Sequence, residues 1–445
     1  MQAHESCRSS ARRVTFIIGV MAIAGSDVAR LDAQDAPPSR RDQPNIVLIM
    51  ADDLGIETLG CYGGTSYRTP HLDRLAATGM RFEHCYSMPV CHPTRVCLLT
   101  GRYPFRLNNP EWGTFPASAE TQTFAHVLER AGYATAIAGK WQLTMLKDDL
   151  DHPHRLGFDT YCLFGWHEGP RYYQPLIWQN GKKRTDVRDR YGPDVYCDFL
   201  IDFMERNRDK PFLAYYPMAL CHDVTDDLDA FVPFGPKGRW DSYHEMVEAT
   251  DERVGRIVAA LERLKLRDNT LILFTGDNGT AQASYLNVVD GKMVREPVIS
   301  KMGDVLVPGG KTRLTDGGTR VPLIANWPMT IKPGQVVSDL VDFSDYLPTF
   351  AELGNAKAPA GVKLDGQSFA ASLLGRDGPR RAWAYSAGRG SHWVRTQRWK
   401  LYDDGRLIDM NADPHEKTPI TNGSPDAVAA RTQLQQALDA LAAKQ

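Results

Sequence analysis

Short runs of apolar, often β-branched residues recur along the chain, and polar residues follow each of them. The first run covers residues 45–50 and reads Asn-Ile-Val-Leu-Ile-Met. Because successive side chains of a strand point to opposite faces, such a run is typical of a strand that is buried on both sides. The same pattern predicts four more strands, at residues 134–138, 212–216, 271–275 and 321–326.

Segments whose apolar residues recur at helical spacing lie between these strands, and the clearest are residues 123–131 and 243–264. Alternation of buried strands with helices favours a parallel sheet that is covered by helices on both faces. The sequence therefore predicts an α/β fold in which a large, mostly parallel sheet lies between two layers of helices.

The pattern changes in the last part of the chain. Short strand-like segments at 383–386, 392–396, 399–402 and 406–410 are separated by tight turns, and Asp404-Gly405 forms one of them. Residues 425–444 have the spacing of an amphipathic helix. We expect a main domain at 44–376 and a smaller antiparallel-sheet subdomain with a closing helix at 377–445.

The first residues have the plan of a secretory signal peptide. Arg12 and Arg13 precede the apolar residues 14–24, which end in Ala22-Ile23-Ala24. We expect a signal peptide at 1–24, a flexible polar linker at 25–43, and export to the periplasm or the medium. An N-terminal membrane anchor is the alternative, but the apolar run is shorter than the ~20 residues of a spanning helix.

Composition excludes some partners. The 445 residues are 42% hydrophobic and 24% charged, with a formal net charge of −2. This balance is that of an ordinary globular protein and gives no reason to expect nucleic acid or an anionic membrane surface as a partner. No apolar run predicts a stable membrane span. The chain has 8 cysteines, and their spacing predicts neither a zinc site nor a disulfide pattern.

Polar side chains follow four of the predicted strands, at the point where each strand ends. In chain order they are Asp52-Asp53, Gly139-Lys140-Trp141-Gln142, His222 and Asp277-Asn278-Gly279. In open α/β sheets, ligands bind outside the carboxyl ends of the strands. We therefore expect these acidic, amide, cationic and imidazole groups to meet at one edge of the sheet.

Four of these residues, Asp52, Asp53, Asp277 and Asn278, offer only oxygen ligands. Clustered carboxylates raise one another's pKa values unless a cation lies among them. An oxygen-only set is typical of Ca²⁺ or Mg²⁺ and not of zinc. Each pair taken alone also fits a helix cap or a tight turn, and the metal site is the interpretation that explains them together.

The segment Cys91-His92-Pro93-Thr94-Arg95 has the features of an anion site. Pro93 suits the first turn of a helix, where its missing N–H would have had no partner. The free N–H groups and dipole of that turn attract negative charge, and Arg95 adds a fixed cation. A buried structural cysteine at a helix start is the alternative for this segment alone.

Residues Cys91 to Arg102 resemble the signature Cys-x-Pro-x-Arg of the type I sulfatases, in the alkaline phosphatase superfamily, and the resemblance extends from Asn45 to about Pro414. It implies an alkaline phosphatase-like fold and hydrolysis of sulfate monoesters of carbohydrates or aryl alcohols. It also implies that a formylglycine-generating maturation enzyme converts Cys91 to formylglycine (3-oxoalanine). A hydroxyl of the aldehyde hydrate would then attack sulfur.

The resemblance implies roles for the other residues. Asp52, Asp53, Asp277 and Asn278, together with residue 91, match the calcium ligands of the family, and Asp277 would help to hold or activate the hydrate. Arg95, Lys140 and Lys311 match the cations around formylglycine and the substrate sulfate, and Lys311 lies in a glycine-rich segment that is also typical of the family. His222 fits a sulfate contact or the acid that protonates the leaving oxygen, with a structural core histidine as the alternative.

One position departs from the family pattern. Sulfatases usually carry Gly-Lys-Trp-His, whereas this chain has Gln142 in the last place. Gln142 can bind a sulfate oxygen, but its amide cannot take up a proton at neutral pH. An inactive sulfoglycan-binding protein is therefore one alternative function. The other is a phosphoester or phosphonate hydrolase of the same superfamily, which would use residue 91 as the same nucleophile.

Overall fold

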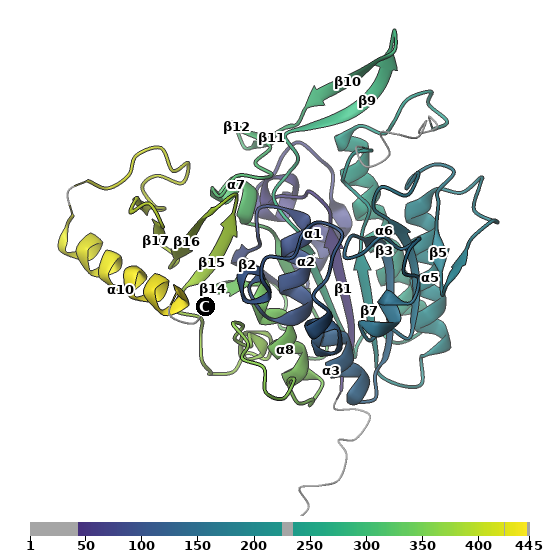
Figure 1. The fold of residues 1–445 in the computed structure, drawn as a ribbon, viewed down its shortest axis with the longest axis horizontal. Coiled ribbons are helices and arrows are strands. Elements are labelled where there is room, and N and C mark those ends of the chain that lie inside the picture. Colours follow the sequence, from purple (N-terminus) through teal and green to yellow (C-terminus); the bar gives the residue numbers. More distant parts are fainter. Residues whose placement is uncertain (1–42, 225–234, 422, 443–445) are drawn as a thin grey trace, which may run out of the picture. The chain divides into compact units, whose positions relative to one another are not determined.

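The computed structural model describes residues 43–224, 235–421 and 423–442. The predicted signal peptide and all of the predicted linker except Gln43 lie outside the described residues. The main feature is a ten-stranded sheet with the order β14-β2-β13-β8-β1-β7-β3-β4-β5-β6 (Figure 1). Its strands are β1 (Asn45–Ala51), β2 (Met80–Tyr86), β3 (Ala134–Trp141), β4 (Thr160–Gly165), β5 (Trp178–Gln179), β6 (Lys182–Lys183), β7 (Phe212–Pro217), β8 (Thr270–Gly276), β13 (Leu323–Asn326) and β14 (Gln335–Asp342).

The centre of this sheet is parallel. Strands β8, β1, β7, β3 and β4 run in one direction, and Leu48 of β1 pairs with Tyr215 of β7 and with Leu273 of β8. Strand β13 is antiparallel to both of its neighbours. The predicted fold class is confirmed, and all five predicted strands lie in this sheet.

Helices cover both faces because the side chains of the central strands alternate. In β1, Leu48 and Met50 contribute to one core, and Val47 and Ile49 contribute to the other. Apolar residues of α2 (Cys91–Thr100), α3 (Phe124–Arg130) and α8 (Tyr346–Leu353) belong to the first core. Those of α1 (Pro70–Ala77), α5 (Gly192–Arg206) and α6 (Tyr243–Arg263) belong to the second.

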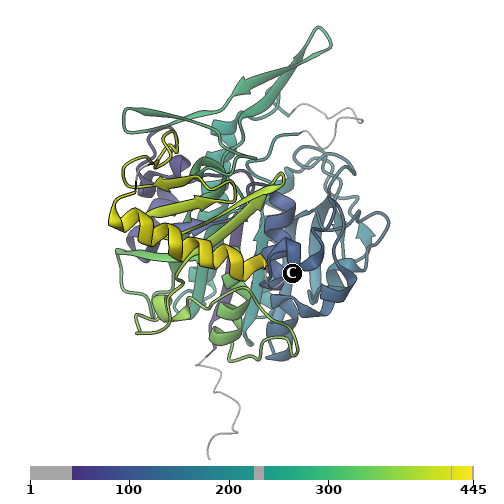
Figure 2. The ribbon, with the colours of Figure 1, turned by 60° about the vertical axis from the view of Figure 1, so that its left-hand side comes forward.

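The predicted small sheet is also confirmed. Strands β15 (Ala384–Gly388), β16 (Ser391–Arg395), β17 (Trp399–Tyr402) and β18 (Leu407–Asp409) form an antiparallel sheet in chain order. Helix α10 (Pro425–Ala442) lies along it (Figure 2). Its apolar residues, Leu434 among them, pack with Val394 and Leu401 of the sheet. The boundary at 376/377 stays a prediction.

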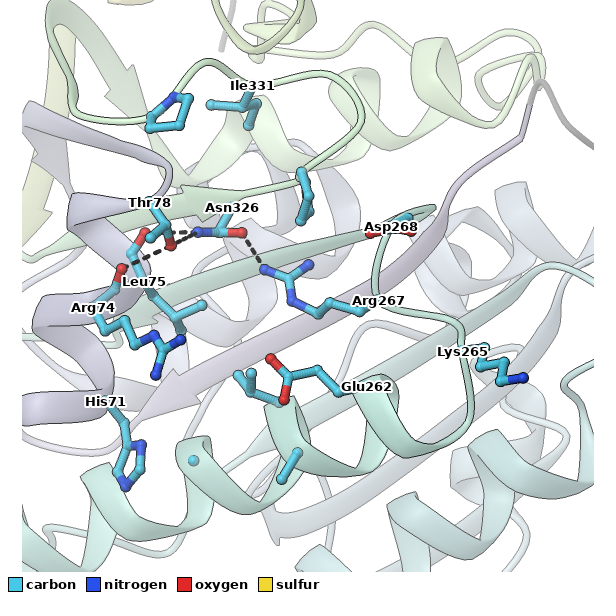
Figure 3. Close-up of a pocket in the computed structure, with 15 residues that line it drawn as sticks. His71, Arg74, Leu75, Thr78, Glu262, Lys265, Arg267, Asp268, Asn326 and Ile331 are labelled. Carbon is cyan, nitrogen blue, oxygen red and sulfur yellow. Dashed lines mark hydrogen bonds between the residues drawn. The ribbon is translucent and has the colours of Figure 1, made fainter.

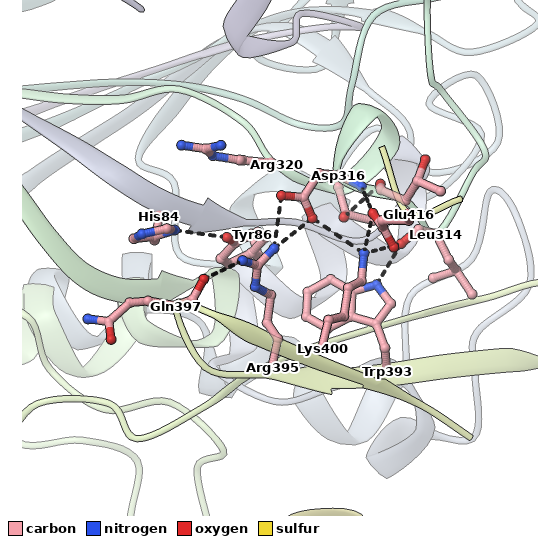
Figure 4. A network of polar contacts seen from close by, with 12 residues as sticks. His84, Tyr86, Leu314, Asp316, Arg320, Trp393, Arg395, Gln397, Lys400 and Glu416 are labelled. Carbon is pink, nitrogen blue, oxygen red and sulfur yellow. Dashed lines mark hydrogen bonds and ion pairs between the residues drawn. The ribbon is translucent and has the colours of Figure 1, made fainter. Parts of the chain in front are cut away.

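A buried ionic network joins the small sheet to α7 (Asp316–Thr319) (Figure 4). Arg395 of β16 donates to both carboxylate oxygens of Asp316, at 2.7 and 2.9 Å. The Lys400 ammonium lies 3.0 Å from a Glu416 oxygen and 3.3 Å from Asp316, and its side chain is fully buried. Because charged groups are expensive to bury without partners, this network fixes the packing of the two parts.

Two hairpins lie between β8 and Lys311. They are β9 (Ala283–Val289) with β10 (Lys292–Pro297), and β11 (Ile299–Met302) with β12 (Val305–Pro308). The remaining α-helices are the short α4 (His152–Arg155) and α9 (Ala370–Leu373). Within the described ranges, no helix has the length and apolarity needed to cross a membrane.

Candidate active site

The four strand ends that the sequence singled out lie side by side, because β8, β1, β7 and β3 are consecutive strands of the large sheet. Backbone hydrogen bonds hold the segments beyond these strands in register. The N–H of Asp52 donates to Leu220 at 2.7 Å, and the N–H of Asp277 donates to Ala51 at 2.9 Å. The acidic groups of Asp52 and Asp277 are thereby held next to each other, and both side chains are fully buried.

Cys91 is the first residue of α2 and is 1% exposed. Its sulfur and one carboxylate oxygen each of Asp52 and Asp277 all lie within 4.8 Å of one another. Burial raises the pKa of the Cys91 thiol, and Lys140 and Lys311 oppose this only in part. An unmodified thiol at this position is therefore protonated at neutral pH, and a protonated thiol is a weak nucleophile.

Each carboxylate of the cluster has its own cation. Lys140 lies 2.5 Å from Asp52, Lys311 lies 2.7 Å from Asp53, and Arg95 lies 2.7 Å from Asp277. The three expected cations thus each lie beside one of the three expected carboxylates, although the residues are far apart in the sequence. The arrangement gives a site in which positive groups are fixed before any ligand arrives.

The carboxylates differ in their electrostatics. Burial opposes ionisation of Asp52, but Lys140, with His222 and Arg95 further away, holds the pKa of Asp52 well below its usual range. Burial and the neighbouring Asp52 raise the pKa of Asp277 to about 7, against the opposing effect of Arg95. A further cation near Asp277 would favour its ionised form.

Two oxygen atoms of this cluster are unsatisfied. Asp52 Oδ1 and Asn278 Oδ1 are buried and have no hydrogen-bond partner among the described residues. Asn278 donates through Nδ2 to Asp53 Oδ1 at 2.8 Å, so its carbonyl oxygen is left as an acceptor. Buried acceptors without partners are costly, and a hard cation would satisfy both. The donor set therefore fits Ca²⁺ or Mg²⁺.

His222 follows β7 and reaches the same cluster. Its Nδ1 lies 2.8 Å from the carbonyl oxygen of Asp223, and its Nε2 lies 3.9 Å from Asp53 Oδ2. A carbonyl only accepts, so Nδ1 carries the hydrogen, and Nε2 is the nitrogen that faces the carboxylate. Gln142 lies beside Arg95 and Lys140, is 2% exposed, and leaves its Oε1 without a partner within the described part of the chain.

Close backbone packing explains the glycines around the site. A Cβ atom on Gly279 would lie 1.9 Å from the carbonyl oxygen of Gly317, and the N–H of Gly279 donates to Gly318 at 3.0 Å. The N–H of Lys311 donates to Thr280 at 2.9 Å. The glycine-rich segment thus packs directly on the Asp277-Asn278-Gly279 turn and carries Lys311 to Asp53.

Sequence reasoning did not single out Tyr243 and Thr280. Tyr243, the first residue of α6, donates to the carbonyl oxygen of Asp53 at 2.8 Å, and Thr280 accepts from the N–H of Gly55 at 3.0 Å. Both contacts stabilise the backbone around Asp53, which has a left-handed φ of 60°. No pattern local to either residue indicates these contacts. The first depends on how α6 packs, and the second depends on how the segments after β1 and β8 meet.

A cavity of about 790 Å³ opens beside this cluster, and Val90, His92, Pro93 and Lys311 are among its lining residues. A second cavity of about 810 Å³ lies between α1, α6 and the residues around Asn326 (Figure 3). Asn326 pairs with Ile272 near the start of β8, whereas Asp277 follows the end of that strand. The second cavity therefore lies at the opposite edge of the sheet from Cys91.

Comparison with known proteins gives consistent results. The family described as Sulfatase matches residues 44–356, and the family described as N-sulphoglucosamine sulphohydrolase, C-terminal, matches residues 311–444. Human arylsulfatase A is 32% identical over 425 residues, which cover 86% of this chain and 80% of that protein. Human N-acetylgalactosamine-6-sulfatase is 30% identical over 434 residues, which cover 85% of this chain and 78% of that protein. The solved structure of Ps i-CgsB in complex with k-i-k-neocarrahexaose has a TM-score of 0.71 and 25% identity, covering 90% of this chain and 93% of that one.

Proposed function

Because the chain belongs to the sulfatase family and is therefore a sulfuric ester hydrolase, we propose that its site works through formylglycine at position 91 and a bound Ca²⁺. The single observation that carries this proposal is the placement of Cys91 at the start of α2, within 4.8 Å of carboxylate oxygens of Asp52 and Asp277. As a buried, protonated thiol Cys91 would be unreactive. Oxidation of this side chain to formylglycine would instead place a reactive group beside Asp52 and Asp277.

The calcium ion would be held by Asp52, Asp53, Asp277, Asn278 and the modified residue 91. The unsatisfied oxygens of Asp52 and Asn278 support this assignment. Bound there, Ca²⁺ would supply positive charge beside the sulfate group, and formylglycine would supply a hydrated aldehyde whose hydroxyl attacks sulfur. We assign the maturation of Cys91 to a formylglycine-generating enzyme.

The protein's own cations bind and orient the sulfate. Negative charge grows on the leaving oxygen as the S–O bond breaks, so fixed positive groups stabilise the transition state more than the ground state. Arg95, Lys140 and Lys311 provide such groups, and each is held in place by one carboxylate. This pairing removes the cost of ordering flexible side chains during the reaction.

His222 or Lys311 would supply the proton that the leaving alcohol needs. Nδ1 of His222 is occupied by the carbonyl of Asp223, so Nε2 is the atom that exchanges a proton. Position 142 holds an amide that cannot exchange one at neutral pH. We therefore place general acid chemistry on His222 or Lys311 and only hydrogen bonding on Gln142.

Substrate and location are parts of the same proposal. The names of the related proteins, N-acetylgalactosamine-6-sulfatase and arylsulfatase A, support a sulfated carbohydrate or an aryl sulfate. The complex of Ps i-CgsB with k-i-k-neocarrahexaose supports the carbohydrate. We also propose export to the periplasm or the medium, on the basis of the N-terminal sequence 1–24.

Mass spectrometry of the peptide that spans Cys91, from protein made in its native host, tests the proposal. We expect the mass of formylglycine, and sulfate release that Cys91→Ala abolishes. An active protein that keeps an unmodified thiol would contradict it. Rates on matched sulfate and phosphate monoesters separate a sulfatase from the phosphoester hydrolase alternative.

A further inference from the structure

The cavity beside residue 91 lies between the main sheet and the small sheet. One side is the start of α2, with Val90, His92 and Pro93. The opposite side is built by β15, by the turn that leads to β16, and by the end of α10. Lys311 also lines it, so the cavity is continuous with the cluster that binds the sulfate in our proposed function. A group attached to that sulfate would enter this space.

An exposed aromatic surface forms part of the wall. Trp112 is 47% exposed, and its ring stacks on the His92 ring with centroids 5.9 Å apart and an angle of 26°. His92 is itself fixed, because its Nε2 lies 2.8 Å from the carbonyl oxygen of Thr114. The ring of Trp112 also lies beside the ring of Trp166, with the two centroids 5.7 Å apart. Aromatic anchors of limited freedom bind flat, partly apolar surfaces at low entropic cost.

The charged residues that line the cavity are basic. Among the described residues that line this cavity none is acidic, whereas Lys311 and Arg389 are cationic. Lys311 is already paired with Asp53. Arg389 lies in the exposed turn between β15 and β16, and no ion pair is found for it in the described ranges. The carboxylate of Asp403, beside this turn, is paired with Ser391 and His392. The cavity in Figure 3 differs, because Glu262 and Asp268 lie there beside its basic residues.

We propose that this cavity binds a sulfated saccharide that carries a second anionic group, a sulfate or a carboxylate. A sugar ring packs against Trp112, and the second anion pairs with Arg389, while the scissile sulfate lies at residue 91. A volume of about 790 Å³ is within the range of pockets for ligands larger than one small ring. A neutral apolar aglycone would pair with Trp112 but would give Arg389 no partner.

This inference rests on the proposed function, and the experiment distinguishes failure of the second-anion subsite from failure of the proposed function. The probes are one disaccharide backbone with a single sulfate, the same backbone with two sulfates, and 4-nitrophenyl sulfate. We expect Arg389→Gln to lower kcat/KM for the disulfated probe about tenfold to a hundredfold, mainly through KM. The same variant should change the rates on the other two probes less than twofold. Trp112→Leu should lower kcat/KM for both saccharide probes. Arg188→Gln is the control, because Arg188 is exposed and does not line the cavity, and it should leave kcat/KM unchanged on all three probes.

Two outcomes overturn the inference. One is equal kcat/KM of Arg389→Gln and the wild type on the disulfated probe, and the other is an equal loss on all three probes. Calorimetric binding of the disulfated probe to the wild type and to Arg389→Gln tests the subsite even where no sulfate is released. Selective binding without turnover would contradict the proposed chemistry and support the subsite, whereas turnover without selectivity would do the reverse.

Discussion

Arg95 donates a hydrogen bond of 2.7 Å to Asp277, although 182 positions separate the two residues. Arg95 lies one turn into α2 and Asp277 follows β8, so the pair fixes the start of the helix against the edge of the sheet. Both side chains are buried, at 3% and 0% exposure. The orientation of residue 91 therefore depends on this ion pair as well as on the helix.

Replacing Arg95 by methionine would remove the cation and leave Asp277 buried. We expect Arg95→Met to lower the free energy of unfolding by about 1–3 kcal/mol, because the buried Asp277 carboxyl loses its hydrogen-bond donor. Sulfate release should fall by about 10²–10³-fold, since one fixed stabilising group is lost. Urea unfolding and a sulfate-release assay measure the two effects.

The double variant Arg95→Met with Asp277→Asn separates the two effects. It should recover part of the stability, since no carboxyl is left without its donor, and it should remain inactive. A single variant as stable as the wild type would show that Asp277 does not depend on Arg95.

Removal of the proposed Ca²⁺ should lower the melting temperature. The buried oxygens of Asp52 and Asn278 have no partner among the described residues, and a bound ion stabilises the folded state by about 2.7 kcal/mol at a hundred times its Kd. We expect EGTA to lower Tm and added Ca²⁺ to restore it. Differential scanning calorimetry and calcium titration measure this without any substrate.

A matched pair of asparagine variants controls this experiment. Asn278→Ala removes one unsatisfied oxygen and should greatly weaken the Ca²⁺-dependent rise in Tm. Asn326→Ala also removes a buried asparagine, 1% exposed, but at the other edge of the sheet, and should keep the full rise. A wild-type Tm that neither EGTA nor Ca²⁺ changes would remove the basis for a calcium site.

The central strands were predictable from the sequence because they are buried on both faces. The run at 45–50 is apolar in nearly every position and became β1 (Asn45–Ala51). Strand β2 (Met80–Tyr86) was missed, since it alternates buried and half-buried positions and includes Arg81, Glu83 and His84. Its place in the sheet is set by pairing with β13 and β14, which are more than two hundred residues away.

The site cluster was predictable for a different reason. Parallel strands end at one edge, so polar residues after Met50 and Thr275 had to lie near one another. The cavity was not predictable, since it forms only where residues 104–112 meet the turn at 388–392 and α10. Trp112 and Arg389 come to line one cavity only after these segments have packed.

Acid should weaken the network around Asp316. Burial opposes its ionisation, but Arg395 and Lys400 hold the pKa of Asp316 well below its ordinary value of 3.8. At a pH between the lowered pKa of the folded protein and the ordinary pKa of 3.8, Asp316 binds more protons in the unfolded chain than in the folded one. The network therefore stabilises the fold fully above about pH 4, and the contribution is lost as the pH falls further. We expect the unfolding free energy to drop below pH 4 more steeply in the wild type than in Asp316→Asn.

At pH 7 the same variant should be less stable by about 3–5 kcal/mol, because Arg395 and Lys400 lose a buried partner. The exposed pair of Asp404 and Arg406, 2.7 Å apart, provides the control, and Asp404→Asn should change stability by less than about 1 kcal/mol. Parallel pH curves for the wild type and Asp316→Asn would contradict the assignment.

The last prediction concerns Gln142, whose buried Oε1 has no partner among the described residues although Lys140 and Arg95 line the same small cavity. If the missing histidine slows regeneration of the site after the alcohol leaves, the wild type should release alcohol in a burst before steady turnover. Gln142→His should then raise kcat at least tenfold, since a placed general acid or base contributes about 10²–10⁴-fold. Gln142→Asn, which keeps an amide, should not raise it. An unchanged kcat in Gln142→His, with no burst in the wild type, would instead assign the second step to another group such as His222.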